Sequence, residues 1–404
     1  MVRGANVICF SSIDWAFNWH APQEVASAFA EAGNRVLFVE NTGVRRVTRG
    51  DASRLWERLK NWRRASGGVR GTGHGVDVHS PLLIPFPYSR AAGFINSRAL
   101  LRVARRWLSR AGDRPLLIMT FLPTPLARSL IHELQPQCTV YYCIDRLAES
   151  SPGARRLRES EPRLIAEADL VFITAENLRS EAMRGARVEL LPSGVRLRDF
   201  EAARQDGSPP PLLHGLERPL IGFVGSVRKQ TDVALLAEVA RLAPDLNFVF
   251  LGPVAVGAEQ LKAQANVRLL GAVAHDVLVR TMTHFDAGVL AYVLDDFTIG
   301  IMPAKLKEYL AAGLSVVSTP LPEVRRFADR HPGVIDFAAD APAFVTALRC
   351  ALARNDPPAV ERRLAVARQY DWALQLARAG DLVERLMTTP AARLSDPGSD
   401  PAEL

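Results

Sequence analysis

The chain has few cysteines, no long apolar run and no recognisable leader sequence. Only four of its 404 residues are cysteine, and their scatter predicts reduced thiols rather than a disulfide framework. No uninterrupted apolar stretch approaches the roughly 20 residues that a membrane-spanning helix needs. The first residues read as a strand and not as a signal peptide. We therefore expect a cytoplasmic protein.

Several motifs that would name a chemistry are also missing. The sequence contains no complete P-loop, no G-x-G-x-x-G, and no Ser-His-Asp, Cys-His or zinc-ligand arrangement. No RNA- or DNA-binding motif is present, which argues against nucleic acid as a partner. We predict no metal ligand and no permanently bound cofactor.

What the sequence does contain is an alternation of short apolar runs with helical patterns, typical of βαβ units and parallel sheets. One series of strand patterns runs from 6–10 to 188–192 and a second from 220–225 to 315–319. The length suits two domains, which we place at 1–200 and 219–369, with a Pro- and Gly-rich linker at 201–218. A bare doubly wound sheet would also fit flavoproteins or epimerases.

The end of the chain carries an amphipathic helix pattern at 370–387, followed by a tail at 388–404 that we expect to be disordered. The helix either caps the second domain or crosses back to the first. The sequence pattern leaves both arrangements open.

The most informative segment reads IGIMPAKLKEYLAAGLSVVSTPLP, from 299 to 322. It predicts a loop, a short helix beginning near 304, and a buried strand after Gly313. Lys305 and Lys307 would stand at the positive end of the helix dipole, which is unfavourable unless an anion lies in front of them. Glu308, one turn on, could hold ribose hydroxyls. This arrangement favours a site for a nucleotide diphosphate.

The run PAKLKEYLAAGLSVVSTPLPEV resembles the donor-binding segment of family 4 glycosyltransferases with the GT-B fold, in their teichuronic-acid-type branch. Glu308 and Gly313 have the spacing of that family. Its Glu-x7-Glu pair would place another Glu at 300, where this chain has Gly300. The resemblance implies a GT-B fold of two Rossmann-like domains facing across a cleft. It also implies a nucleotide-diphospho-sugar donor and retention of anomeric configuration.

The resemblance places the donor in the second domain. A glycine-led turn with Gly225, Arg228 and Lys229 would bind the pyrophosphate, and strand ends near 252 and 273 would face the base. The predicted donor residues are Gly225, Arg228, Lys229, Gly252, Val273, Thr298, Lys305, Leu306 and Glu308. Taken alone, a Gly-rich turn with basic neighbours is more often structural than functional.

The first domain would bring the acceptor. Asp14 and His20 lie on or just after the loop that follows the first strand, and Asp145 ends another strand pattern. Ligands of open α/β sheets bind at such strand ends. We predict these three residues as acceptor contacts or proton handlers, although a lone His is more often structural.

Charge is distributed unevenly between the halves. Residues 1–200 hold 29 Lys and Arg against 19 Asp and Glu, a net of +10, whereas the remainder holds 21 against 24, a net of −3. The basic stretches 44–70 and 97–110 carry apolar residues at helical spacing, which suits a helix lying on an anionic membrane. Ordinary amphipathic packing would give the same pattern.

The sequence thus predicts a metal-independent glycosyltransferase that is peripheral on the inner membrane face and acts in bacterial cell-surface polysaccharide synthesis. Its acceptor would be a glycan or a lipid-linked acceptor. Two alternatives stay open: a sugar-nucleotide epimerase on the same fold, and a catalytically silent GT-B partner subunit at the membrane.

Overall fold

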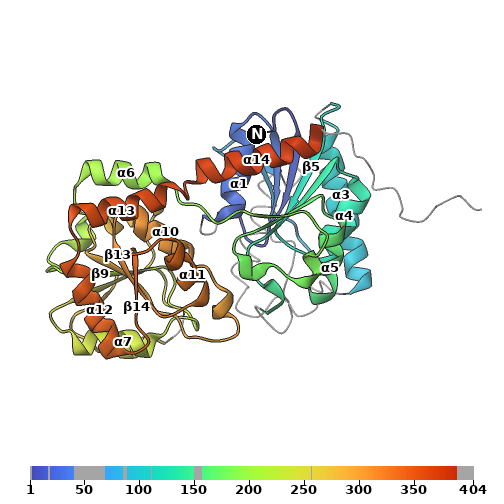
Figure 1. Cartoon of the computed structure of the whole chain (residues 1–404). Coiled ribbons are helices and arrows are strands. Elements are labelled where there is room, and N and C mark those ends of the chain that lie inside the picture. The colour runs from blue at the N-terminus through green and yellow to red at the C-terminus, as the bar shows by residue number, and fades with distance from the viewer. Residues whose placement is uncertain are drawn as a thin grey trace, which may run out of the picture.

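The computed structural model describes residues 2–388 except 17–18, 41–68, 85–88, 111, 150–156 and 256. Figure 1 shows two α/β domains side by side, each built on one sheet with helices on both faces. The expectation of parallel sheets is confirmed, because every strand pair except β3–β4 is parallel.

The first domain has an eight-stranded sheet whose central strands are buried on both faces, as parallel strands usually are. In spatial order its strands are β3 (Val69–Gly71), β4 (Val76–His79), β2 (Arg35–Val39), β1 (Asn6–Phe10), β5 (Leu116–Thr120), β6 (Cys138–Cys143), β7 (Leu170–Ile173) and β8 (Val188–Leu190). Its helices are α1 (Ala21–Glu31), α3 (Arg90–Leu108), α4 (Pro125–Leu134) and α5 (Leu157–Glu167). Helix α1 packs on one face, and α3, α4 and α5 contribute to the core on the other.

The second domain has a six-stranded sheet with the same plan. In spatial order its strands are β11 (Val267–Leu269), β10 (Asn247–Leu251), β9 (Leu220–Val224), β12 (Ala287–Leu290), β13 (Ser315–Ser318) and β14 (Ile335–Phe337). Its helices are α6 (Leu197–Asp206), α7 (Val233–Leu242), α8 (Glu259–Lys262), α9 (His275–Met282), α10 (Ala304–Ala311), α11 (Pro322–Arg330), α12 (Ala341–Ala353) and α13 (Pro357–Arg368).

The chain crosses between the domains twice, and the two crossings are bonded to each other. The Val195 N–H donates to the Tyr370 carbonyl at 2.9 Å, and the Trp372 N–H donates to the Val195 carbonyl at 3.0 Å. Gly194 lies against the indole of Trp372, where a Cβ at 194 would come within 2.6 Å of the ring. The two crossings, 192–196 and 370–372, therefore form one hydrogen-bonded connection, called here the paired strap. A rotation of one domain relative to the other would turn about both segments together.

Helix α14 (Trp372–Thr388) follows the second crossing and lies along the first domain, as Figure 1 shows. Leu376 and Val383 of this helix are part of the core that β1 and α1 also form. The Gln137 side chain donates to the Met387 carbonyl at 2.8 Å. The last described helix is therefore packed into the first domain.

Two expectations from composition differ from the structure. Residues 201–218 are not an interdomain linker, because they complete α6 and continue into a short helical turn, and Phe200, Ala203 and Leu213 are buried in the second-domain core. The crossings lie at 192–196 and 370–372 instead. The prolines and glycines of residues 201–218 mark a loop on the surface of the second domain.

The stripe at 97–110 is also buried rather than free for a membrane. Leu100, Leu101, Ala104 and Trp107 pack in the core of the first domain, so the amphipathic pattern reflects ordinary packing with arginines on the wet side. The stretch 44–70 lies outside the described residues except for 69–70 in β3, and 389–404 lies outside them too. Among the helices that the structure describes, none is both long and apolar enough to cross a bilayer.

Candidate active site between the two domains

In each sheet there is one pair of neighbouring strands from which the chain order runs outward in opposite directions. The loops after these two pairs of strands face the same cleft. In the first sheet this pair is β1 and β5, and in the second it is β9 and β12. Ligands of open α/β sheets bind outside the carboxyl ends of such strand pairs, because neighbouring loops diverge there. The fold itself therefore directs attention to the loops after β1, β5, β9 and β12.

A cavity of about 520 Å³ occupies this position, within the roughly 300–1,000 Å³ typical of small-molecule sites. Ser12 and His20 line it from the loop after β1, and Phe121 follows β5. Gly225 and Tyr292 line it from the loops after β9 and β12. Both domains thus contribute walls to one cavity.

Lys305 lines the cavity from the second domain and brings a positive charge to it. Its ammonium lies 4.3 Å from the centre of the Phe223 ring and 5.6 Å from that of Tyr292. Among the described residues no carboxylate lies within ion-pair distance of this ammonium. Burial lowers the pKa of Lys305 to about 8, Glu308 partly offsets that effect, and Arg228 adds to it. An incoming anion would relieve the desolvation of this charge.

Gly225 allows the chain to pass over this ammonium. Its φ is +111°, and a Cβ at this position would lie 3.1 Å from the Lys305 Nζ. The backbone of the turn and the ammonium can therefore both approach one bound group. Arg228, four positions along, also lines the cavity.

The start of helix α10 strengthens the attraction for an anion. Thr124 caps α4 and Asp232 caps α7 with side-chain oxygens, whereas α10 begins after Pro303 with no side-chain cap. Uncapped N–H groups at a helix start attract negative charge. Because Ala304 lines the cavity, this end of α10 faces the same space as Lys305.

Glu308 lies one turn further along α10 and also lines the cavity. Burial raises the pKa of its carboxyl, while His275 and Lys305 lower it. The ring of His275 lies 3.5 Å from a carboxylate oxygen of Asp199. Glu308 can therefore accept hydrogen bonds from hydroxyl groups of a ligand held by Lys305.

His20 and Asp145 occupy the opposite wall. The cleft desolvates His20 and so lowers its pKa, and the charge of Arg228 lowers it further. Burial raises the pKa of Asp145 to about 6. Burial also raises the pKa of Tyr292, and the charge of Asp145 adds to that rise. Groups from the two domains thus act on one another across the cavity. At neutral pH both His20 and Asp145 are in the form that accepts a proton.

The structure brings together six of the predicted residues: His20, Asp145, Gly225, Arg228, Lys305 and Glu308 all line the cavity. Asp14 does not line it, although its carbonyl accepts from the Gln23 side chain that shapes the same loop. Lys229 points away into solvent near Asp295. Val273 packs against the second-domain core.

Three other predicted residues are structural. Leu306 is fully buried in the core, because it lies on the sheet-facing side of α10. The Thr298 hydroxyl accepts from the Asp295 N–H at 2.8 Å and donates to the Val293 carbonyl, so it folds the loop. Gly252 packs against the backbone of Gly225, and a Cβ there would lie 2.3 Å from the Gly225 carbonyl oxygen. None of the three lines the cavity.

Replacing Gly252 by alanine is expected to lower the free energy of unfolding by about 2–4 kcal/mol, because the new Cβ would meet backbone at a φ of +142°. Gly271→Ala is the matched control. Its φ is +73° but no atom would lie within 4 Å of the new Cβ, so we expect a loss of only about 1 kcal/mol. Urea unfolding of both variants checks this, and equal losses would contradict the close contact.

Lys307, the second lysine of the motif, does not serve the cavity. It donates to the Ser193 carbonyl at 2.7 Å and lies 5.0 Å from the centre of the Tyr370 ring. Burial lowers its pKa to about 7. It therefore braces α10 against the first crossing, and only one lysine of the pair faces the cleft.

Sequence reasoning missed several residues of the cavity. Arg196 forms an ion pair with Glu24 of α1 and lies 4.7 Å above the centre of the Trp19 ring, which joins the first crossing to the first domain. Tyr292 stands at the end of β12 and contacts Lys305. No local pattern marks Arg196, whereas the position of Tyr292 at a strand end could have been noticed.

Gly300, where the family has Glu, sits at a contact between the domains. The Asn177 amide donates to the Gly300 carbonyl at 3.0 Å, and Arg146 donates to the Asn177 carbonyl at 2.7 Å. A Cβ at 300 would lie 3.3 Å from the Asn177 amide nitrogen. The position is thus used to join the two domains.

Within the part of the chain that the structure describes, no group of three or more His, Cys, Asp and Glu side chains could hold a metal ion. The charged groups that face the cavity from the second domain are those of Arg228, Lys305 and Glu308, together with His275 when protonated. The cations among them can neutralise phosphate groups directly.

Two Rossmann-like domains with this cleft define the GT-B class of proteins. Residues 218–354 match the family model described as glycosyl transferases group 1. The chain is 29% identical over 287 residues to the putative teichuronic acid biosynthesis glycosyltransferase TuaH of Bacillus subtilis (strain 168), covering 65% of this chain and 70% of that protein. The family match is thus confined to the second domain, and the two likenesses together confirm the prediction of a glycosyltransferase.

Solved structures confirm the fold. Sucrose-phosphate synthase from Thermosynechococcus elongatus superposes with a TM-score of 0.66 at 16% identity, covering 95% of this chain and 99% of that one. Anabaena HepE in complex with UDP gives 0.65 at 12% identity, covering 94% and 100%. Trehalose 6-phosphate synthase from Burkholderia multivorans gives 0.64 at 15% identity, covering 95% and 99%. The predicted GT-B fold is thus confirmed.

Proposed function

We propose that the protein transfers a sugar from a nucleotide-diphospho-sugar to a glycan or lipid-linked acceptor in bacterial cell-surface polysaccharide synthesis. The observation that carries the donor assignment is Lys305, a partly buried cation without a carboxylate partner beside an uncapped helix start. HepE, which has the same fold, was solved with UDP. The polysaccharide role is supported by the name of the Bacillus subtilis relative.

In this proposal the second domain holds the donor. Lys305, Arg228 and the start of α10 bind the diphosphate, and Glu308 accepts from the ribose hydroxyls. When the bond between the anomeric carbon and the phosphate oxygen breaks, negative charge grows on the leaving diphosphate. Fixed cations and N–H groups stabilise that charge, so we propose transfer that does not require a metal.

The first domain would hold the acceptor. The acceptor oxygen forms the new bond to the anomeric carbon, and its proton leaves to a base on this wall. Asp145 and His20 are suited to this role because both accept a proton at neutral pH. Retention of configuration is part of the proposal and is supported by the family resemblance. Rotation about the paired strap would close the cleft and exclude water.

The donor assignment can be tested by a thermal-shift screen of nucleoside diphosphates and their sugars. One nucleotide family should raise the unfolding midpoint. At a ligand concentration of one hundred times its Kd, binding adds about 2.7 kcal/mol to the free energy of unfolding. Glu308→Ala should abolish most of the shift, whereas Glu217→Ala, at an exposed position outside the cavity, should not.

No shift with any nucleotide would contradict the donor site and favour a catalytically silent subunit. Release of nucleoside diphosphate that depends on an added acceptor would separate a transferase from an epimerase. The comparisons give no support to either alternative.

A further inference from the structure

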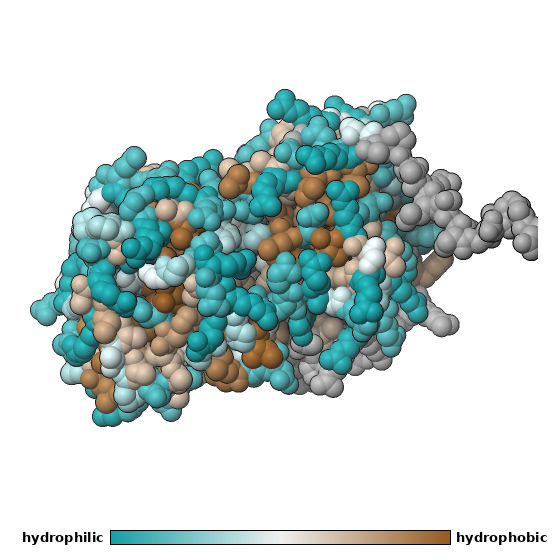
Figure 2. All heavy atoms as spheres, in the orientation of Figure 1, coloured by the Kyte–Doolittle hydropathy of each residue, from teal (hydrophilic) through white to brown (hydrophobic). Residues whose placement is uncertain are grey.

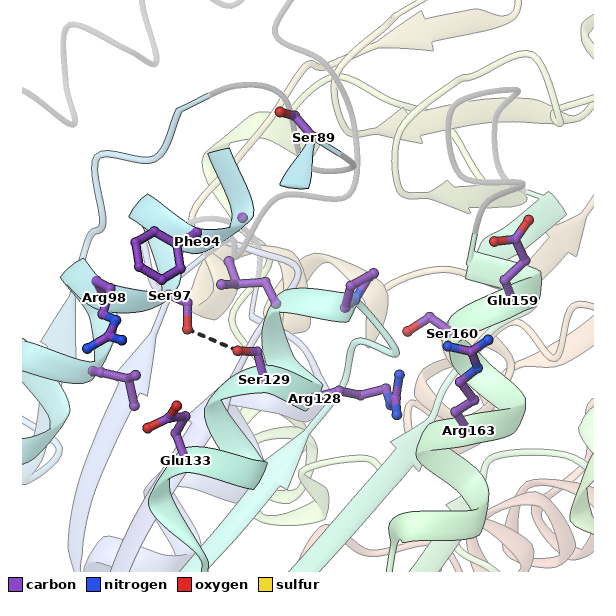
Figure 3. Close-up of a pocket in the computed structure, with 14 residues that line it drawn as sticks. Ser89, Phe94, Ser97, Arg98, Arg128, Ser129, Glu133, Glu159, Ser160 and Arg163 are labelled. Atoms are coloured by element: carbon purple, nitrogen blue, oxygen red, sulfur yellow. Dashed lines mark hydrogen bonds between the residues drawn. The ribbon is translucent and has the colours of Figure 1, made fainter. Parts of the chain in front are cut away.

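A second pocket lies on the first domain, between helices α3, α4 and α5. Its volume is about 610 Å³, and its lining includes Ser97 and Arg98 of α3, Arg128 and Ser129 of α4, and Ser160 and Arg163 of α5. Figure 3 shows Arg98 at one end of the pocket, Ser160 and Arg163 at the other, and Ser129 and Arg128 of α4 between them. None of them lines the cleft between the domains. The pocket is therefore a separate site.

One wall of this pocket has a hydroxyl without a partner. Ser160 is only 4% exposed, and its Oγ makes no hydrogen bond. Ser97 and Ser129 differ from Ser160, since their hydroxyls bond to each other at 3.1 Å. In Figure 3 the Ser160 hydroxyl is directed toward Arg128 across the pocket. A buried hydroxyl normally has a partner, so a ligand oxygen would supply what Ser160 lacks.

The pocket also has guanidiniums without a carboxylate partner, although that of Arg98 lies 5.1 Å from the centre of the Phe94 ring. Arg128 is held by Glu167, with its Nε 2.8 Å from a carboxylate oxygen. Among the described residues Arg98 and Arg163 have no carboxylate within ion-pair distance. The lining also holds two carboxylates. Glu133 pairs with Arg105, which leaves Glu159 in the described lining against the guanidiniums of Arg98 and Arg163. A phosphate, with several acceptor oxygens, suits guanidinium and hydroxyl donors together.

The rim beside these cations is apolar and exposed. Phe94 and Ile95 are 62% and 53% exposed, which makes them the most exposed large hydrophobic residues in the described part of the chain. They belong to α3, whose sequence RAAGFINSRALLRVARRWL holds five arginines and no acidic residue. Figure 2 shows hydrophobic groups, in brown, between the hydrophilic ones on the face that it draws. Exposed aromatic and aliphatic side chains flanked by arginines are typical of surfaces that bind anionic membranes.

We propose that this face of α3 docks on an anionic bilayer, with a phospholipid phosphate seated in the pocket and Phe94 and Ile95 in the headgroup layer. The phosphate would contact Arg163 and Ser160, and Arg98 would face the lipid headgroups from α3. The membrane-contacting surface is thus formed by the first turns of α3, and not by the apolar residues of 97–110 that pack in the core. It deepens the proposed function, because a lipid-linked acceptor has to be met at a membrane, but the pocket does not depend on the donor site.

The test is sedimentation of the full chain with vesicles of phosphatidylcholine alone or mixed with phosphatidylglycerol. We expect binding only to the mixed vesicles, weakening as salt rises. Arg98→Glu/Arg163→Glu should weaken it at least about 25-fold, since each cation near such a surface contributes about five-fold. Phe94→Ser/Ile95→Ser should weaken it by a similar factor, and Ser160→Ala by about two- to five-fold.

Controls are Leu374→Ser, at a half-exposed leucine of α14, and Arg268→Glu in the second domain, and both should bind like the wild type. No binding to the mixed vesicles, or losses no larger than in the controls, would overturn the proposal. A further result would also overturn it: glycerol phosphate raises the unfolding midpoint of Phe94→Ser/Ile95→Ser, while no variant changes vesicle binding. That combination would indicate a site for a soluble phosphate. Nucleotide thermal shifts should persist in every variant, so failure of docking is distinguishable from failure of the donor site.

Discussion

Replacing Lys305 by methionine is expected to reduce kcat/KM for the nucleotide-sugar by about 10²–10³, or roughly 3–4 kcal/mol of transition-state stabilisation. The reason is that the ammonium of Lys305 lies against the Gly225 turn in the cavity, and methionine keeps its length without its charge. Release of nucleoside diphosphate under steady-state conditions measures the loss. Lys262→Met, at an exposed lysine of α8, is the matched control and should change kcat/KM less than two-fold.

The pH dependence of nucleotide binding gives the same residue a distinct signature. Because the pKa of Lys305 is about 8 in the free protein and a bound anion would raise it, the Kd should increase as pH rises above about 8. The increase can reach ten-fold per pH unit until the pKa of the complex is passed. In Lys305→Met the Kd should be independent of pH between about 7.5 and 9.5. The same slope in the variant would assign the effect to another group.

Replacing Asp145 by asparagine is expected to stabilise the protein while removing most of its activity. The pKa of this carboxyl is about 6 in the folded protein, against an ordinary value of 3.8, so the folded state binds more protons between these two pH values. Stability is therefore lost as pH rises through 6, and at pH 7.5 the ionised Asp145 lowers the free energy of unfolding by up to about 3 kcal/mol. Asparagine carries no such cost.

Urea unfolding at two pH values tests this expectation. Asp145→Asn should raise the free energy of unfolding by about 1–3 kcal/mol at pH 7.5, and by about half as much at pH 5. The rate of transfer should fall by about 10²–10⁴, as for loss of a proton-transfer group. Asp296→Asn, at an exposed carboxylate in the loop after β12, should change neither quantity appreciably. A destabilised Asp145→Asn would show that this carboxylate is held by structural contacts.

The fold was predictable from the sequence because parallel sheets have a strong local signature. Runs such as NVICF and LIGFV are apolar on both faces, and both became fully buried strands. The short strands β3, β4 and β14, at or next to the sheet edges, were not predicted, since three or four partly polar residues give no clear period. The domain boundary was misplaced because Pro and Gly mark any surface loop.

The candidate site was predictable where one segment carries the signal. Lys305 and Glu308 lie three apart on α10 and share a face, whereas Lys307 lies two from Lys305 and had to point elsewhere. The rings of Phe223 and Tyr292 around the ammonium come from other strands, so no local pattern could reveal them. Arg196 was missed for the same reason, because its partner Glu24 is 172 residues away in the chain.

The position of α14 has a consequence for biosynthesis of the chain. The first domain combines residues near the start with a helix that ends at Thr388, and Leu376, Val383 and Met387 of that helix fill one face of its core. On the ribosome the second domain, whose residues are contiguous from 195 to 370, can complete its core first. The first domain is synthesised first, but its core stays incomplete, with apolar surface near β1 uncovered, until α14 has emerged from the ribosome. During that interval the nascent chain should be the species most prone to bind chaperones or to aggregate.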